Sequence, residues 1–217
     1  MMRLAHFFQT PLFAMFYMVS CAPNVIDANG ANGSAAAILL ANLQKSQETQ
    51  EQPQASLLRV FETSTIYGVP AQFNSVAAAD AICQSDPNYP GSGVYRAMIA
   101  QPGVRVASVS PNAGDGQVDW VIQANRRYIR LSDQQTIQIS NAVGLFVFPL
   151  LNPVHPTNFL AAWTGLNTTW QTGGNCSDWS SNAGSANAGD IRLVTSGMLF
   201  SFNNGCGGGG LLVCVEQ

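Results

Sequence analysis

The sequence predicts an α+β domain after residue 57, and three features of that part of the chain support this class. One helix is expected over Ser75–Ser85, with Asn74 as its N-cap. Short runs of β-branched and aromatic residues, which are typical of strands, lie on both sides of it. Stretches rich in Gly, Asn, Ser and Thr separate these runs and predict long loops. A helix beside many short strands belongs to the α+β class.

The first half of this domain opens with a strand. Leu57–Tyr67 mixes β-branched and aromatic residues, which favours a strand there. The helix carries small apolar residues and Cys83, and Pro and Gly turn residues in Asp86–Gly93 end it. Three further short strands are expected, at Tyr95–Ile99, Arg105–Val109 and Trp120–Ile122.

The second half is richer in loops. An apolar run at Asn141–Pro149 ends at a proline, and buried strands are expected at Trp163–Leu166 and Leu211–Val215. The segment between those two strands is rich in Gly, Asn, Ser and Thr, so it is expected to form long loops.

Composition limits the class of protein. The 217 residues suit one domain with additional segments. Charged residues make up only 10%, against about a quarter in ordinary domains, and the net charge is −3. Lys45 is the only lysine, so no nucleic-acid partner and no polybasic membrane patch is expected. A weakly charged chain with cysteines that can pair suits an extracytoplasmic protein.

The N-terminus has the features of a targeting segment. A positive start with Arg3 precedes an apolar stretch that is too short and too interrupted to span a membrane, so residues 1–20 are interpreted as a signal peptide. Met18–Cys21 resembles a bacterial lipobox, which implies a lipid on Cys21; the alternative is an ordinary secretory peptide with an incidental cysteine. Residues 21–56 are polar and are expected to be a flexible tether. An exported protein anchored at the outer membrane of the cell envelope is therefore expected.

Four cysteines remain in the predicted domain, Cys83, Cys176, Cys206 and Cys214. They allow three pairings, and spacing alone does not choose among them.

Several motifs lie around and between these cysteines: Ala78–Cys83, Asp119–Val121, Phe146–Pro149, Trp163–Leu166, Cys176–Trp179 and Cys214–Gln217. The segments around the cysteines resemble endostatin-type, C-type-lectin-like domains, and the chain from about Leu58 onward is similar to a family of uncharacterised spirochaete surface lipoproteins. The resemblance implies short twisted antiparallel strands, one to two helices, long loops, and the nested disulfides Cys83–Cys214 and Cys176–Cys206.

Catalysis is not expected. His155 is the only histidine after the signal peptide, and it lies between two prolines in what is expected to be an exposed loop. Too few histidines and free cysteines remain for a zinc site, and no Gly-rich phosphate loop is evident. The protein is therefore expected to be neither an enzyme nor a cofactor carrier.

A calcium-dependent sugar site is a sharper hypothesis. C-type lectins have a Trp-Asn-Asp tripeptide just before their third cysteine, and this chain has Phe202-Asn203-Asn204 there. The candidate Ca²⁺ ligands are Asp178, Asp190, Asn203 and Asn204. The alternative is that these residues only form turns.

Other side chains are candidates for ligand contact. Trp163 and Trp179 are expected in the core, whereas Trp170 is expected to be exposed and able to stack on a sugar ring. Arg126, Arg127 and Arg130 could form a basic patch, or simply a solvated strand face.

A looser polar cluster precedes these residues. Asn112, Asp115 and Asp119 could form it, or a tight turn in which Asp side chains accept hydrogen bonds from backbone amides.

The function favoured by these observations is a non-catalytic binding module that engages a host or envelope protein, or a glycan, through its loops. The alternative is a structural envelope lipoprotein without an external ligand.

Overall fold

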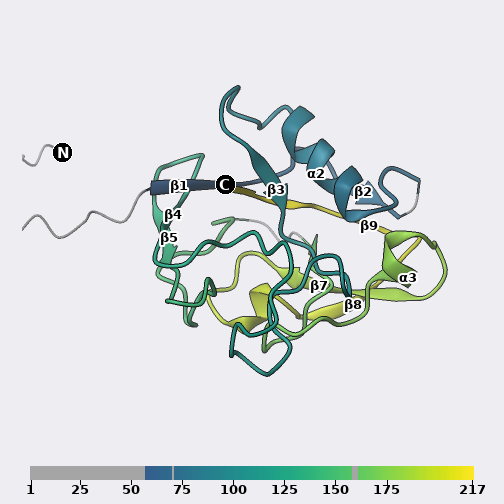
Figure 1. The fold of residues 1–217 in the computed structure, drawn as a ribbon. Coiled ribbons are helices and arrows are strands. Elements are labelled where there is room, and N and C mark those ends of the chain that lie inside the picture. Colours follow the sequence, from purple (N-terminus) through teal and green to yellow (C-terminus); the bar gives the residue numbers. More distant parts are fainter. Residues whose placement is uncertain (1–56, 70, 158–160) are drawn as a thin grey trace, which may run out of the picture. The chain divides into compact units, whose positions relative to one another are not determined.

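The computed structural model describes residues 57–69, 71–157 and 161–217, and it has the expected α+β class (Figure 1). The expected signal peptide 1–20, the lipid on Cys21 and the tether 21–56 lie outside the described residues. The elements in chain order are β1 (Leu57–Glu62), β2 (Tyr67–Gly68), α2 (Val76–Ser85), β3 (Tyr95–Ala97), β4 (Arg127–Arg130), β5 (Thr136–Ile139), β6 (Ala161–Trp163), α3 (Cys176–Trp179), β7 (Ser185–Asp190), the 3-10 turn η1 (Ser196–Met198), β8 (Phe202–Gly205), β9 (Gly209–Gly210) and β10 (Val213–Glu216).

The largest sheet joins the two ends of the domain. Its strand order is β3-β10-β1-β4-β5, so the first and last strands lie side by side, as Figure 1 shows. β1 pairs antiparallel with β10, with Val60 opposite Val215, but it pairs in parallel with β4, which differs from the expected antiparallel arrangement. A three-stranded sheet, β6-β7-β8, and the short pair β2-β9 complete the strands.

Helix α2 packs against β3 and buries Val76, Ala79 and Cys83. Its N-cap is Ser75, whose Oγ accepts a hydrogen bond from the backbone N–H of Ala78 at 3.1 Å. The expected N-cap, Asn74, was therefore wrong by one residue. Both residue types can cap a helix, and only the extended backbone of Ser75 places its hydroxyl at the third N–H.

Two of the expected strands do not form, and several unexpected ones do, among them β5, β7 and β8. Arg105–Val109 and Trp120–Ile122 contain only single bridges and loop backbone, such as Val106 opposite Val118. In contrast, β7 is built from Ser-Ala-Asn-Ala-Gly-Asp, which was expected to be loop. At Gly189 of β7, an added Cβ would lie 1.8 Å from the backbone oxygen of Met198. Close packing therefore requires glycine at this position of β7, although glycine has low strand propensity.

Two buried clusters fill the interior. One contains both disulfides, Trp163 and Trp179, and it lies against α2 and β3. The other contains Trp170, Phe146 and Tyr128. Trp163 and Trp179 are 0% exposed, so the prediction that they belong to the core is confirmed.

Candidate functional site: an uncharged pocket between loops

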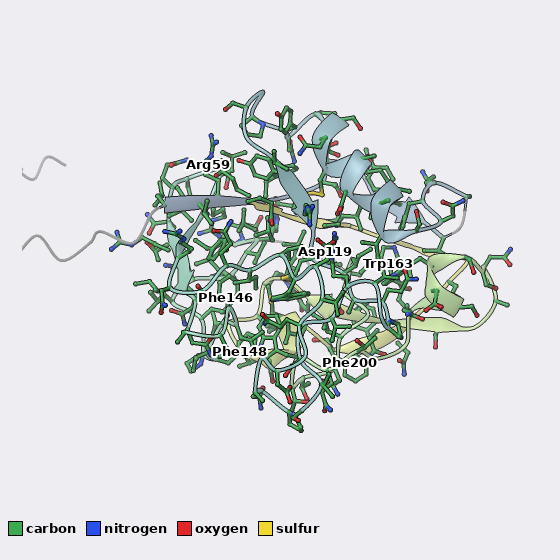
Figure 2. All side chains as sticks on the ribbon, viewed as in Figure 1. Arg59, Asp119, Phe146, Phe148, Trp163 and Phe200 are labelled. Carbon is green, nitrogen blue, oxygen red and sulfur yellow. A yellow bond between two sulfur atoms is a disulfide. The ribbon has the colours of Figure 1, made fainter. Side chains whose placement is uncertain are left out.

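The pocket described here has a volume of about 320 Å³ and opens between loops that come from distant parts of the chain. Asn112 belongs to the long connection after β3, and Asn141–Phe148 belongs to the one after β5. Thr168 and Trp170 follow β6, and Ser196 begins η1. Figure 2 shows Phe146 and Phe148 on the side of the domain away from α2. The full lining is Asn112, Asn141, Leu145, Phe146, Val147, Phe148, Thr168, Trp170 and Ser196.

Trp170 lines this pocket but is only 1% exposed, so the expectation that it is an exposed stacking platform was wrong. The ring of Phe148 stacks on it, with centroids 5.8 Å apart and planes 18° from parallel. Trp120 and Phe146 meet it edge-on, at 5.8 Å and 6.2 Å. Such aromatic pairs are stabilising beyond the area that they bury. No local pattern predicts that Phe148, which belongs to another loop, covers the indole.

The loop that carries Trp170 is held by one side chain. Trp170 has a φ of 68°, a left-handed conformation that costs a residue with a Cβ roughly 1–2 kcal/mol. Asn167 Oδ1 accepts hydrogen bonds from the backbone N–H of Thr169 at 2.9 Å and of Gln171 at 3.0 Å. These bonds fix the turn, and the turn fixes the position of the indole.

The opposite wall is shaped by Asn141. Its Oδ1 accepts hydrogen bonds from the backbone N–H of Val143 at 3.1 Å and of Leu145 at 2.9 Å. Gly144, between them, has a φ of 67°, and an added Cβ would lie 2.4 Å from the backbone oxygen of Ile122. Only glycine fits at this turn. The peptide bond between Phe148 and Pro149 at the end of this loop is cis.

The lining of this pocket contains no ionisable side chain. Its polar groups are the amides of Asn112 and Asn141, the hydroxyls of Thr168 and Ser196, and the indole N–H of Trp170. Aromatic and aliphatic carbon forms the rest. Of these residues, Asn112 and Trp170 were the ones expected from the sequence to be candidate polar or contact residues. The apolar run Phe146–Pro149 was the one sequence feature that could have indicated the aromatic wall of the pocket. An apolar run in a loop packs into the core or lines a surface pocket.

The candidate Ca²⁺ ligands do not converge. Asp190 lies opposite Ala161, and Asn203 lies opposite Asn187, three residues away along β7. Residues three apart on a strand face opposite sides of the sheet, so these two side chains diverge.

Three of the candidate ligands, Asp190, Asn204 and Asp178, already have hydrogen-bond partners within the domain. Both carboxylate oxygens of Asp190 accept hydrogen bonds from Arg192, which lowers the pKa of Asp190. The amide of Asn204 donates to the carbonyl of Gly209 at 3.0 Å, and Asp178 Oδ1 accepts from Asn175 at 3.0 Å. The described part of the chain holds no group of three His, Cys, Asp or Glu that could bind a metal ion.

The three arginines do not form an exposed patch. Arg130 is 4% exposed, and its guanidinium donates to Asp133 at 2.8 Å and to the carbonyl of Pro153 at 3.1 Å. Arg127 is partly buried, and its Nε is a buried atom without a partner among the described residues. Arg126 directly precedes β4, and its backbone N–H donates a hydrogen bond to Ser140 Oγ at 2.9 Å. Because Arg130 is buried, the three arginines form neither of the two alternatives, an exposed basic patch or a fully solvated strand face.

A second polar centre lies beside α2 and is built from charges. Arg105 is 1% exposed, and its guanidinium donates to both carboxylate oxygens of Asp80, at 2.7 and 2.8 Å, and to Asp119 Oδ2 at 2.7 Å. Arg96 also pairs with Asp119. Burial opposes the ionisation of Asp119, but the hydrogen bonds from Arg105 and Arg96 outweigh it and lower the pKa of this carboxyl. We name Arg105, Asp80, Asp119 and Arg96 the charged network.

Asp115 forms the tight turn that was one of the two interpretations of this region. It accepts hydrogen bonds from the backbone N–H groups of Ser110 at 2.7 Å and Val109 at 3.0 Å. These hydrogen bonds lower the pKa of the Asp115 carboxyl to about 2, and the bond from Ser110 contributes most. Asp115 and Asp119 therefore belong to separate arrangements, and both have structural partners.

His155 is not the exposed loop residue that was expected. Its Nδ1 lies 2.9 Å from Glu62 Oε1, and the two side chains are 21% and 18% exposed. Thr157 Oγ1 lies 3.3 Å from its Nε2. The histidine thus ties the loop after β5 to the end of β1, outside the pocket.

Two disulfides join Cys83 to Cys214 and Cys176 to Cys206. These are the pairs that the family resemblance implied. The first ties α2 to β10, and the second ties α3 to the end of β8. In the described ranges, no helix is long and apolar enough to cross a membrane.

Comparison with known proteins places the chain in a family. No curated protein matches it. Residues 67–196, which cover β2 to the start of η1 and every pocket residue, match the family described as "Protein of unknown function (DUF1554)". The chain therefore belongs to the DUF1554 family.

Proposed function

We propose that this protein is an extracytoplasmic, lipid-anchored binding module without catalytic activity, which engages a protein or glycan partner through the pocket between its loops. The observation that carries the proposal is the lining of the pocket, which combines aromatic and aliphatic carbon with amide and hydroxyl groups and has no ionisable side chain. Binding pockets are typically apolar with a few placed polar groups.

The absence of ionisable groups from the pocket lining supports a non-catalytic role. General acid–base and nucleophilic catalysis need a titratable side chain within hydrogen-bond reach of the substrate. The charged side chains described above are engaged elsewhere: Arg105 and Asp119 in the charged network, Asp190 with Arg192. The pocket therefore has the groups to hold a ligand but not those to transform it.

The position at the cell envelope rests on the lipobox-like Met18–Cys21 and on the resemblance to spirochaete surface lipoproteins. Two buried disulfides support an oxidising compartment. Labelling cells with a radioactive fatty acid tests the anchor, because Cys21→Ser should abolish the label. Incorporation that persists in this variant would contradict a lipid on Cys21.

The C-type-lectin-like fold remains part of this proposal. Pairing of the first and last strands, nested disulfides and long loops all support it. Such a fold places loops of variable sequence on a pinned scaffold, and loops of this kind commonly carry recognition.

The test is solid-phase binding of the full chain to a panel of matrix proteins, envelope proteins and neutral glycans. Thr168→Glu places a charge in the uncharged pocket, and Thr65→Glu places one at an exposed position outside its lining. We expect at least one panel component to bind, with affinity lost in Thr168→Glu and retained in Thr65→Glu. Equal affinity in both variants, or no binding to any component, would count against the proposal.

Protease treatment of intact cells separates this function from a structural role inside the envelope. A binding module for external partners should be digested when the protease is added outside. Protection of the folded domain would favour the structural lipoprotein instead.

A further inference from the structure

The four tryptophans differ in one respect. Three donate their indole N–H to a backbone carbonyl: Trp120 to Gly144 at 3.0 Å, Trp163 to Tyr67 at 2.8 Å and Trp179 to Ala100 at 3.2 Å. Trp170 Nε1 has no acceptor among the residues that the structure describes. A buried indole usually finds one, so this N–H is left for something else.

This N–H is also reachable. The described side-chain atoms that are both sealed from solvent and without a partner are Tyr95 Oη and Arg127 Nε. Trp170 Nε1 is not one of them, so the small exposed part of this side chain includes its nitrogen. Because Trp170 lines the pocket, a ligand there can reach the donor although the residue is 1% exposed.

A second donor is fixed by its surroundings. Asn141 Oδ1 is engaged by two backbone N–H groups, so the other end of its amide, the NH₂ group, is the end left for a ligand. The pocket thus offers two fixed N–H donors beside apolar carbon. A ligand that brings hydrogen-bond acceptors to this part of the pocket suits these two donors, because a buried N–H without an acceptor is costly.

The packing around the Trp170 ring further limits the kind of ligand that the pocket can bind. Phe148 covers one face of Trp170, while Trp120 and Phe146 meet the same ring edge-on. The indole therefore presents its N–H and not an open face on which a sugar ring could stack. Half-buried Phe148 and Val147, which is 59% exposed, supply the apolar contact instead.

We propose that the pocket binds a proline-rich peptide segment in the polyproline II conformation, with one of its backbone carbonyls accepting the hydrogen bond of Trp170 Nε1. This inference rests on the proposed function and names its ligand class. Proline brings a carbonyl and no N–H. The carbonyls of a polyproline II segment have no partner within the segment, and its rigid backbone loses little entropy on binding. An uncharged segment also matches the uncharged lining.

The test is ¹⁵N NMR of the full chain, with the four indole N–H signals assigned by single Trp→Phe variants. In the free protein, the Trp170 signal should exchange with water faster than the other three. Capped decaproline should then shift the Trp170 signal, while a capped Gly-Ser peptide of equal length should not. Trp170→Phe keeps an aromatic ring and removes the donor, and it should weaken decaproline binding about tenfold.

Several outcomes would overturn the inference. These are an unshifted Trp170 signal at saturating decaproline, an equal shift with the Gly-Ser peptide, or unchanged affinity in Trp170→Phe. Should Trp170→Phe fail to fold, Phe148→Leu provides the second variant, and its full affinity for decaproline would count against the proposal.

The two proposals fail separately. A Trp170 shift with maltohexaose but not with decaproline overturns the peptide inference and leaves the proposed function standing. The proposed function falls only if Thr168→Glu and Thr65→Glu bind the panel equally, or if nothing in the panel binds.

Discussion

The charged network and the pocket between the loops differ in how their buried polar groups are paired. In the charged network, Arg105 is almost fully buried, and both of its carboxylate partners meet it with short hydrogen bonds. In the pocket, the lining has no charge, and the N–H of the buried Trp170 indole has no acceptor among the described residues. Buried polar groups normally have partners, so the charged network is satisfied from within the domain, whereas the pocket fits the external partner that we propose.

The largest expected effect on stability concerns the disulfide that ties α2, which lies beside the charged network, to β10. Replacing Cys83 and Cys214 with alanine opens a loop of 131 residues and should lower the free energy of unfolding by about 5 kcal/mol. The matched pair Cys176→Ala and Cys206→Ala opens a loop of 30 residues and should cost about 3.6 kcal/mol. Urea unfolding measures both. A larger loss from the shorter loop would show that chain entropy does not set the order.

The charged network should be the next most sensitive feature. Arg105→Met removes the cation and leaves Asp80 and Asp119 without their shared partner, which should cost about 3 kcal/mol. Arg96→Met is the control, because Arg96 and Asp119 are 37% and 42% exposed where they pair, and its loss should cost under about 1 kcal/mol. Equal losses in urea unfolding would mean that burial of Arg105 does not matter.

Low pH should weaken the contribution of the charged network to stability. The pKa of Asp119 is lowered in the folded protein, so its contribution is present above the unfolded pKa of about 3.9 and is lost as pH falls through the lower folded value. Since Asp119 is 42% exposed, Asp119→Asn should cost at most about 1 kcal/mol at pH 7. The variant should lose less stability than the parent between pH 5 and pH 2. Parallel pH profiles of thermal unfolding would argue against this role.

The smallest expected effect on stability lies in the pocket. Thr168 is exposed and makes no side-chain hydrogen bond within the described residues, so Thr168→Glu should change the free energy of unfolding by no more than about 0.5 kcal/mol. A loss above about 2 kcal/mol in urea unfolding would mean that the pocket wall is part of the stable scaffold.

Local sequence patterns predicted the elements that depend on neighbouring residues. The opening strand, the helix ending at Ser85 and the strand starting at Tyr95 are all present, because turn residues and strand propensity act over short ranges. Strand β7 was missed because its small and polar residues have low strand propensity, and the tight fit of Gly189 against the backbone of Met198 in η1 is a tertiary contact. Propensity carries no information about such a neighbour.

The candidate site depended even more on distant neighbours. Trp170 was recognised as a possible contact residue, but its burial depends on Phe148 and Trp120, from two other loops. The Ca²⁺ candidates were chosen by residue type, and the register of β7 with its neighbours separates them. Residue type indicated which chemistry was available, and tertiary packing decided which groups meet.

The most direct test of the central claim compares binding across the two regions in one assay. The affinity of the folded full chain for the panel component that it retains would be measured for Thr168→Glu and Arg105→Met. We expect Thr168→Glu to weaken binding at least tenfold while Arg105→Met, although less stable, stays within about twofold of the parent. The opposite pattern, with affinity lost in Arg105→Met and kept in Thr168→Glu, would contradict the assignment of recognition to the pocket.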